Sequence, residues 1–218
     1  DRLGCSLQSA FGQTEASPMI CLNHDDVTFD DICYCAGQPL PHTSVSIRHP
    51  ETGAVLEVGE VGEICAKGYN VMIGYHNNPD ATHAAIDEDH WLHTGDLGKL
   101  DQRGFIQVTG RVKDMIIRGG ENHFPAEIEN TLMESPQVAE VAVVGIPDEK
   151  WGEVIAAFVR TAEDMPWDAD NLKSFCRSHL SPQKTPSIWR HVDAFPLTGS
   201  GKIQKFKIRE KYLSGDYE

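Results

Sequence analysis

A lysine near the end of the sequence has the surroundings of an anion-binding group. Lys202 follows Gly199, Ser200 and Gly201 on a segment that we expect to be a flexible loop. Glycine tolerates positive φ, so the two glycines would let the backbone bring the ammonium of Lys202 close to a ligand. The Ser-Gly-Lys tripeptide is weak as an indication of function, because most exposed lysines between glycines are merely solvated.

Two further segments carry oxygen atoms that suit a nucleotide. In the run FGQTE at residues 11–15, Gly12 permits a tight bend, Thr14 offers a hydroxyl and Glu15 offers a hard oxygen, as a Mg²⁺-bound triphosphate requires. An ordinary turn that feeds a helix is the alternative. Asp96 follows a glycine at a strand edge, where its carboxylate can accept two hydrogen bonds from a ribose diol or can cap a turn.

Four segments, taken together, resemble a known family. They are FGQTEAS at residues 11–17, HTGDLG at 93–98, GRVKDMIIRGGENHFPAEIE at 110–129 and PLTGSGK at 196–202. In this order and spacing they resemble the late motifs of the adenylate-forming superfamily, which includes acyl-CoA synthetases, luciferases and the adenylation domains of peptide synthetases. The resemblance covers nearly the whole chain.

The resemblance implies two half-reactions. A carboxylate attacks the α-phosphate of ATP to give an acyl-adenylate and pyrophosphate, and a thiol then takes the acyl group. The implied cofactors and partners are a small-molecule carboxylic acid, ATP, Mg²⁺ and coenzyme A. In this family the small C-terminal domain swings about a hinge between the two steps.

Matching positions in the family imply roles in the first half-reaction. Lys202 would stabilise the negative charge of the transition state, Thr14 would contact the phosphate and Glu15 would hold Mg²⁺. The matched nucleotide-binding set is Phe11, which stands where the family usually has Tyr and would lie against adenine, Gly12, Asp96 on the ribose, and Arg111.

Other positions match the second half-reaction. Lys113 matches the hinge residue of the family. Gly119 and Gly120 would line the pantetheine tunnel, where a side chain would block the thiol.

Within the superfamily, the sequence favours an acyl-CoA synthetase. Ser-Gly-Lys-Ile at 200–203 and Gly-Gly-Glu-Asn at 119–122 resemble CoA ligases, and no carrier-protein domain follows before Glu218. His123 departs from the aliphatic residue common after the second of these runs. A peptide-synthetase adenylation domain, a CoA-independent acyl-AMP ligase and a non-catalytic nucleotide- or partner-binding module are the alternatives.

One expected motif has no counterpart. Far upstream of the Phe-Gly-x-Thr-Glu motif the family carries a Ser/Thr/Gly-rich loop ending in Lys, which wraps the β- and γ-phosphates, and no such stretch is found here. We therefore expect the chain to be the C-terminal portion of a longer enzyme and to be inactive alone. Much of the acyl pocket would lie elsewhere, so the acid is not predicted.

Composition limits the partners. The formal net charge of −14 repels nucleic acid and anionic membranes, so a phosphate-bearing ligand needs local positive groups or metal ions. Such a group, or else a solvated helix face, is formed by Lys202, Lys205, Lys207, Arg209 and Lys211.

The sequence also bears on the cellular location. No apolar run is long enough to cross a bilayer and residues 1–3 do not open a signal peptide, so we expect a cytoplasmic protein. We expect its six cysteines to be reduced.

The pattern of apolar residues, glycines and prolines along the sequence predicts an α+β fold in two parts. Residues 1–110 read as the end of a large nucleotide-binding domain, with short antiparallel strands from residue 37 to 109 in a distorted, barrel-like arrangement. Residues 111–114 form the expected hinge. Residues 115–218 read as a small mobile α+β domain, with strands at 138–146, 153–161 and 188–192 and helices at 126–134, after Asp168 and at 206–213.

Overall fold

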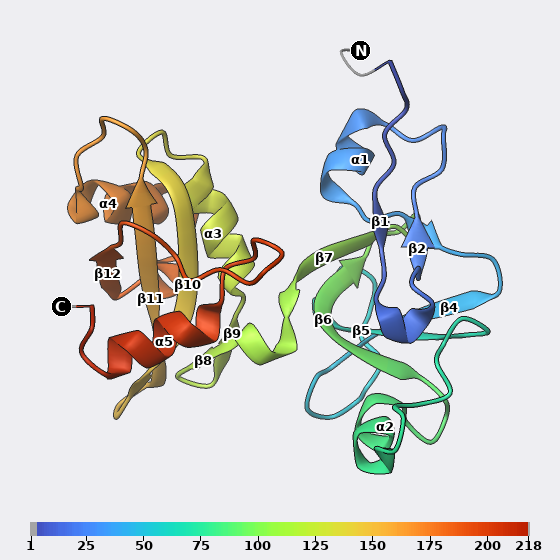
Figure 1. Ribbon diagram of the computed structural model, residues 1–218. Coiled ribbons are helices and arrows are strands. Elements are labelled where there is room, and N and C mark those ends of the chain that lie inside the picture. The colour runs from blue at the N-terminus through green and yellow to red at the C-terminus, as the bar shows by residue number, and fades with distance from the viewer. Residues whose placement is uncertain (1–3, 218) are drawn as a thin grey trace. The chain divides into compact units, whose positions relative to one another are not determined.

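The computed structural model describes residues 4–217, and Figure 1 shows its helices and strands. Residues 1–3, on which part of the expected location rests, lie outside it. The chain separates into two compact units, unit 1 (Asp1–Val112) and unit 2 (Lys113–Glu218), so the division falls within residues 111–114. In the described part of the chain, no helix combines the length and the apolarity that a membrane span requires.

The described residues of unit 1 form two antiparallel sheets, as the pattern of short strands separated by turns predicts. The larger sheet has the order β4 (Thr43–Arg48), β5 (Gly62–Gly68), β6 (Leu92–Leu100), β7 (Ile106–Arg111), and the smaller sheet joins β1 (Ala10–Phe11), β2 (Cys21–Leu22) and β3 (Gln38–Pro39). Among the described residues β4 and β7 are the two edges of the larger sheet and do not pair. The sheet is therefore open, and the barrel-like arrangement expected for this segment does not amount to a closed barrel.

Two short helices accompany these sheets. α2 (Pro79–Ala85) begins with a proline in its first turn, and the side chain of Asn78 caps it by accepting a hydrogen bond from the Ala81 N–H at 3.1 Å. α1 (Phe29–Tyr34) was not expected and begins with a reciprocal capping box between Thr28 and Asp31.

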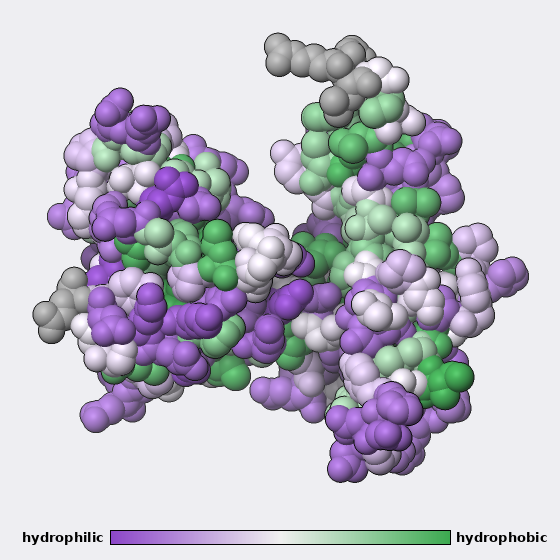
Figure 2. All heavy atoms as spheres, in the orientation of Figure 1, coloured by the Kyte–Doolittle hydropathy of each residue, from purple (hydrophilic) through white to green (hydrophobic). Residues whose placement is uncertain are grey.

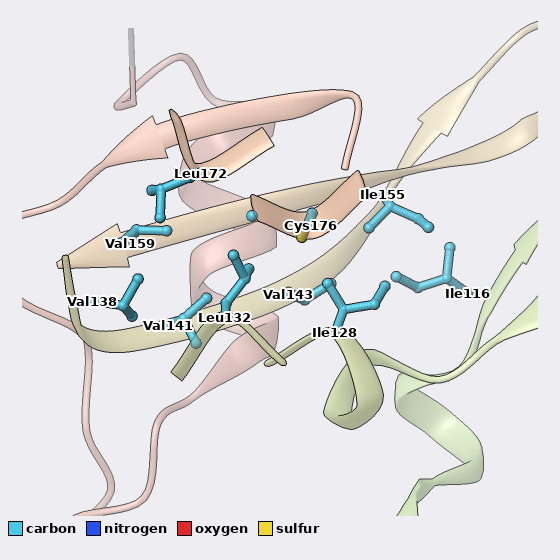
Figure 3. Packing of buried hydrophobic residues seen from close by; sticks show 11 residues of the cluster. Ile116, Ile128, Leu132, Val138, Val141, Val143, Ile155, Val159, Leu172 and Cys176 are labelled. Atoms are coloured by element: carbon cyan, nitrogen blue, oxygen red, sulfur yellow. The ribbon is translucent and has the colours of Figure 1, made fainter. Parts of the chain in front are cut away.

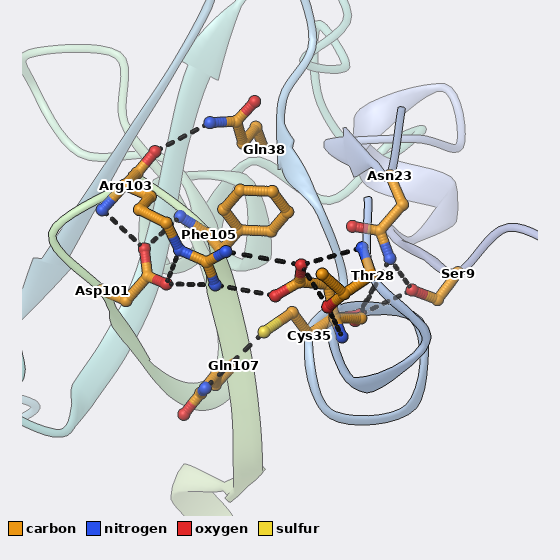
Figure 4. Close-up of polar contacts among 10 residues, drawn as sticks. Ser9, Asn23, Thr28, Cys35, Gln38, Asp101, Arg103, Phe105 and Gln107 are labelled. Atoms are coloured by element: carbon orange, nitrogen blue, oxygen red, sulfur yellow. Dashed lines mark hydrogen bonds and ion pairs between the residues drawn. The ribbon is translucent and has the colours of Figure 1, made fainter. Parts of the chain in front are cut away.

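Arg103 ties α1 to the β6–β7 connection (Figure 4). Its Nη2 lies 2.7 Å from Oδ1 of Asp31, and a second ion pair reaches Asp101 at 3.0 Å. The guanidinium of Arg103, together with the hydroxyl of Thr28, lowers the pKa of Asp31 to about 2. The unexpected helix is thus fixed to the sheet by a charged contact.

Between residues 113 and 217, unit 2 is a mixed sheet with three α-helices, close to the expected small α+β domain. The strands are β8 (Ile116–Arg118), β9 (Glu121–His123), β10 (Val138–Asp148), β11 (Gly152–Thr161) and β12 (Ile188–His191), in the order β10-β11-β8-β9 with β12 parallel to β11. The helices are α3 (Pro125–Met133), α4 (Ala169–His179) and α5 (Lys205–Leu213).

The two long strands of unit 2 bury both of their faces. On one face, Val141, Val143, Ile155 and Val159 pack with Ile128 and Leu132 of α3 and Leu172 and Cys176 of α4, as Figure 3 shows. On the other, Ala142, Val144, Ala156 and Phe158 pack with Ile208 of α5. This explains why both strands read as near-continuous apolar runs. His179, at the C-terminal end of α4, is exposed and hydrogen-bonds to the Phe175 carbonyl.

Candidate functional site

The Phe-Gly-x-Thr-Glu segment forms a turn that the neighbouring backbone approaches closely. A Cβ on Gly12 would lie only 1.9 Å from the Pro18 carbonyl oxygen, so close approach of the chain, more than a bend, requires glycine there. Thr14 and Glu15 lie on the 3₁₀ turn Thr14–Ala16, with Thr14 exposed. Phe11 is partly buried and packs against the hydrophobic cluster that contains Ala16.

Glu15 is held by a segment 60 residues away. Its backbone carbonyl accepts the Met72 N–H at 2.8 Å, and its Oε1 accepts the Tyr75 hydroxyl at 2.8 Å. That hydrogen bond to a carboxylate raises the pKa of Tyr75. The sequence did not single out Tyr75, because nothing in the local pattern shows which residue it faces.

Asp96 and Arg111, both matched to nucleotide-binding positions, are brought together by strand pairing. They are opposite each other in the β6–β7 register, and Nε of Arg111 lies 3.3 Å from Oδ1 of Asp96. The carboxylate is mostly buried, at 17% exposure, whereas half of the Arg111 side chain is exposed. Gly95, with φ of +71°, places Asp96 on an irregular part of β6.

The Glu15 and Asp96 segments rest on one hydrophobic cluster of unit 1. Ala16, next to Glu15, and Leu92, at the start of β6, are both fully buried in it. The same cluster includes Ile20 and Ala66. The 3₁₀ turn that carries Glu15 and the start of the strand that carries Asp96 therefore pack in the same cluster.

In unit 2, Gly119 and Gly120 form the turn between β8 and β9. Their φ values of +61° and +83° belong to a tight hairpin turn that favours glycine at both positions. The Gly119 N–H bonds to the Trp151 carbonyl at 2.8 Å. Lys113, the matched hinge residue, is exposed on the short 3₁₀ turn Val112–Asp114.

A cavity of about 330 Å³ lies beside this glycine turn. It is lined by Arg118, Gly119, Glu121, His123, Trp151, Pro182 and Gln183. Burial lowers the pKa of His123, and neither of its ring nitrogens has a hydrogen-bond partner within residues 4–217. The departure from an aliphatic residue at this position thus places a neutral imidazole in the wall of the cavity.

Lys202 lies on a hydrogen-bonded turn and not on a loose loop. The Thr198 N–H bonds to the Lys202 carbonyl at 2.8 Å, and the Lys202 N–H bonds to Oγ1 of Thr198 at 3.0 Å. Gly201 has φ of +81°, but Gly199 does not have positive φ, so the expectation for Gly199 is wrong. The backbone of Lys202 and the side chain of Thr198 hold this turn, and the Lys202 residue is exposed.

Two residues of the basic cluster that follows Lys202 form ion pairs with glutamates of unit 2. Nζ of Lys205 lies 2.7 Å from Oε1 of Glu129, and Nη2 of Arg209 lies 3.3 Å from Oε1 of Glu153. Oε1 of Glu129 also accepts the N–H of Val143 on the edge strand β10. Two of the five cations therefore serve the fold of unit 2, and they are poor candidates for a phosphate.

Each of the two units contains residues that match a known protein family. The family described as AMP-binding enzyme matches residues 1–76, and the one described as AMP-binding enzyme C-terminal domain matches residues 127–202. Similar proteins include a putative acyl-CoA synthetase, YngI, of Bacillus subtilis, 44% identical over 214 residues, and the mitochondrial medium-chain acyl-CoA ligase ACSF2 of Bos taurus, 45% identical over 202 residues. These matches cover 98% and 93% of this chain but only 39% and 33% of the relatives.

Solved structures of similar fold point to the same family. ATP-bound MatB from Rhodopseudomonas palustris superposes with a TM-score of 0.89 at 35% identity, over 96% of this chain and 41% of that one. The o-succinylbenzoate CoA synthetase MenE from Bacillus subtilis, in complex with its acyl-adenylate intermediate, gives 0.84 at 36% identity, over 94% of this chain and 41% of that one. The chain therefore belongs to the adenylate-forming superfamily of AMP-binding enzymes, and within it is similar to acyl-CoA synthetases.

Proposed function

We propose that the protein carrying this chain is an AMP-forming acyl-CoA synthetase. It joins a carboxylic acid to AMP with release of pyrophosphate, and then transfers the acyl group to coenzyme A with release of AMP. The observation that carries the proposal is the β6–β7 register, which sets Asp96 opposite Arg111. A carboxylate that can accept from a ribose diol stands there beside a guanidinium that can contact phosphate.

The first half-reaction falls to residues of both units. Lys202 stabilises the negative charge that develops at the α-phosphate, and Thr14 donates a hydrogen bond to phosphate. Glu15 fits a Mg²⁺ ion, because its hard carboxylate oxygens are partly exposed and Tyr75 holds one of them in place. Bound Mg²⁺ would offset the charge of the phosphates. Phe11 and Gly12 form the side of the site that faces adenine.

The second half-reaction uses the glycine turn of unit 2. Gly119 and Gly120 line the path of the pantetheine arm, and the cavity beside them gives that arm room. A Cβ on Gly120 would meet no atom of unit 2 within 4 Å, so only the positive φ of this residue opposes a side chain there. We propose that Lys113 is the hinge residue about which unit 2, as the mobile C-terminal domain, turns between the two steps.

Two observations support a longer enzyme. The chain spans 33–39% of the length of its curated relatives. Unit 1 also exposes large apolar side chains, including Phe29, Tyr69 and Ile73, and Figure 2 shows hydrophobic surface on this unit. Such surface usually contacts further protein or ligand. We propose that this chain is the C-terminal part of the enzyme and has no turnover alone.

The substrate class and the location are narrower proposals. One relative is a medium-chain acyl-CoA ligase, so medium-chain fatty acids are the first carboxylic acids to test. We propose a cytoplasmic enzyme, although that relative is mitochondrial, and subcellular fractionation would test this.

The test uses the full-length enzyme with ATP, Mg²⁺, coenzyme A and a panel of carboxylic acids. Pyrophosphate should appear only when an acid is present, with AMP and an acyl thioester as final products. Formation of ADP in place of AMP would contradict the proposal. Acyl-AMP that accumulates without thioester formation would favour the CoA-independent ligase instead, and acyl-CoA formed by the 218 residues alone would contradict their inactivity.

A further inference from the structure

Glu63, a carboxylate on the buried strand β5, has no role in the site described so far. The residue is only 8% exposed, and its neighbours Ile64, Cys65 and Ala66 are fully buried. A buried carboxylate is costly unless it is hydrogen-bonded. Its partners therefore show what the charge is used for.

The partners of Glu63 belong to a bulge in β6. In the β5–β6 register Glu63 faces Leu97 and Cys65 faces His93, so one residue of β5 stands against residues 94–96 of β6. The extra residues leave the regular ladder and need other hydrogen-bond partners for their N–H groups. Asp96, proposed to hold the ribose, is the last residue of this bulge.

Side-chain oxygens replace the missing ladder bonds. Oε1 of Glu63 accepts the Gly95 N–H at 3.0 Å. Oγ1 of Thr94 accepts the Asp96 N–H at 3.1 Å and donates to the Ile64 carbonyl at 2.6 Å. The shape of the bulge, and hence the direction in which Asp96 leaves the strand, depends on these bonds.

A chain of polar and charged side chains fixes Glu63 itself. Its Oε2 lies 2.7 Å from Nδ1 of His93, whose Nε2 lies 3.7 Å from Oδ2 of Asp87. The same Asp87 oxygen pairs with Nη1 of Arg48 at 3.0 Å. Glu63 therefore has one oxygen for the bulge and one for its own anchor.

The same residues also have the donor types of a metal site. Ligand atoms of Glu63, Cys65 and His93 lie within 4.8 Å of one another. However, both oxygens of Glu63 are engaged, and burial together with the Glu63 charge raises the pKa of Cys65 to about 12. A protonated thiol is a poor ligand, so the cluster is better explained as the anchor of the bulge.

We propose that Glu63 is a positioning residue, which holds residues 94–96 in the conformation that lets Asp96 grip the ribose of ATP. The inference rests on the proposed function of Asp96. It predicts a defect that depends on the ribose hydroxyls and not on the fold in general.

The test compares Glu63→Ala and Glu63→Gln in the full-length enzyme. Glu63→Ala should raise the KM for ATP about 10-fold to 100-fold, the range that loss of a hydrogen bond to a charged group gives, with kcat changed less than about threefold. Glu63→Gln keeps an oxygen for the Gly95 N–H and should stay within about fivefold of wild type. Glu57→Ala, which removes an exposed carboxylate of the same unit, is the control and should behave as wild type.

Substrate analogues separate positioning from stability. With 2′,3′-dideoxy-ATP, which offers no diol to Asp96, Glu63→Ala should lose almost nothing relative to wild type. The double variant Glu63→Ala/Asp96→Ala should be no worse than Asp96→Ala alone, because both act on one contact. If Glu63→Ala is recovered unfolded, Glu63→Asp replaces it, since it keeps the charge but withdraws the oxygen from Gly95.

The outcomes are distinguishable. If Asp96→Ala leaves the KM for ATP unchanged, the ribose role of Asp96 fails, and the inference fails with it. If Asp96→Ala raises KM but the Glu63 variants do not, only the inference fails. An equal loss with ATP and with the dideoxy analogue would show a structural role for Glu63 and would also overturn it.

Discussion

Replacement of Gly120 by leucine tests the role of the glycine turn in the second half-reaction. Gly120 has φ of +83°, and a non-glycine residue in the left-handed region costs about 1–2 kcal/mol. No atom lies within 4 Å of a Cβ built on Gly120, so a Cβ at this position makes no clash inside unit 2. Gly104, with φ of +81° and equally open surroundings, offers a matched control in unit 1. Gly119 is less suitable, because its Cβ would lie 3.0 Å from the Trp151 ring.

The two variants should therefore lose similar stability and differ in chemistry. If Gly120 lines a filled tunnel, forcing a leucine into it costs about 1–3 kcal/mol or more, which slows thioester formation roughly 5-fold to 150-fold. The assays are pyrophosphate release from ATP and acid, acyl-CoA formation from synthetic acyl-AMP and coenzyme A, and thermal unfolding. Gly120→Leu should lose only thioester formation, and Gly104→Leu should lose neither activity. Equal losses of both half-reactions in Gly120→Leu would refute a tunnel role.

Three further predictions follow from individual contacts. The pKa of Asp31 is lowered to about 2. The contribution of its charge to the free energy of unfolding is therefore complete above the usual pKa of Asp and is lost as the pH falls toward 2. Asp31→Asn should be less stable than the wild type at pH 6 but not at pH 2, as measured by denaturant unfolding. Tyr75→Phe removes the hydroxyl that holds Glu15 and should raise the Mg²⁺ concentration for half-maximal pyrophosphate release about 5-fold to 10-fold, whereas an unchanged Mg²⁺ dependence would count against Glu15 as the ligand. Leu132→Ala opens a cavity in the core of unit 2 and should cost about 2–5 kcal/mol in the free energy of unfolding, measured by urea titration.

The elements of unit 2 were predictable because its local patterns agree with its packing. The runs at 138–146 and 153–161 are β-branched and apolar, and they form β10 and β11. Asp168 caps α4 as its position suggests, by accepting the Asn171 N–H at 3.0 Å. In such segments burial, capping and propensity point to the same structure.

Other features depend on contacts that a local pattern does not contain. The six residues of α1 are too few to show a helical period, although Thr28 and Asp31 carried the spacing of a capping box. The antiparallel strands of unit 1 were predicted, but whether β4 meets β7 depends on long-range pairing.

The same limit applies to the candidate site. Asp96 and Arg111 were identified singly, through resemblance to the family, and only the strand register shows that they pair. Tyr75 and Glu63 were missed because their partners lie in other segments of the chain. The position of this acidic residue directly before the apolar run Ile64, Cys65 and Ala66 was the one local sign that Glu63 has a special role.

The most direct test of the account is Lys202→Ala in the full-length enzyme, assayed separately in the two half-reactions. The turn is held by the backbone of Lys202 and the side chain of Thr198, so alanine should leave it intact. If the ammonium acts only on charge that develops at the α-phosphate, synthesis from ATP should slow by about 10²-fold or more, while acyl-CoA formation from synthetic acyl-AMP and coenzyme A stays near the wild-type rate. Equal losses in both assays, with a lowered melting temperature, would contradict the account.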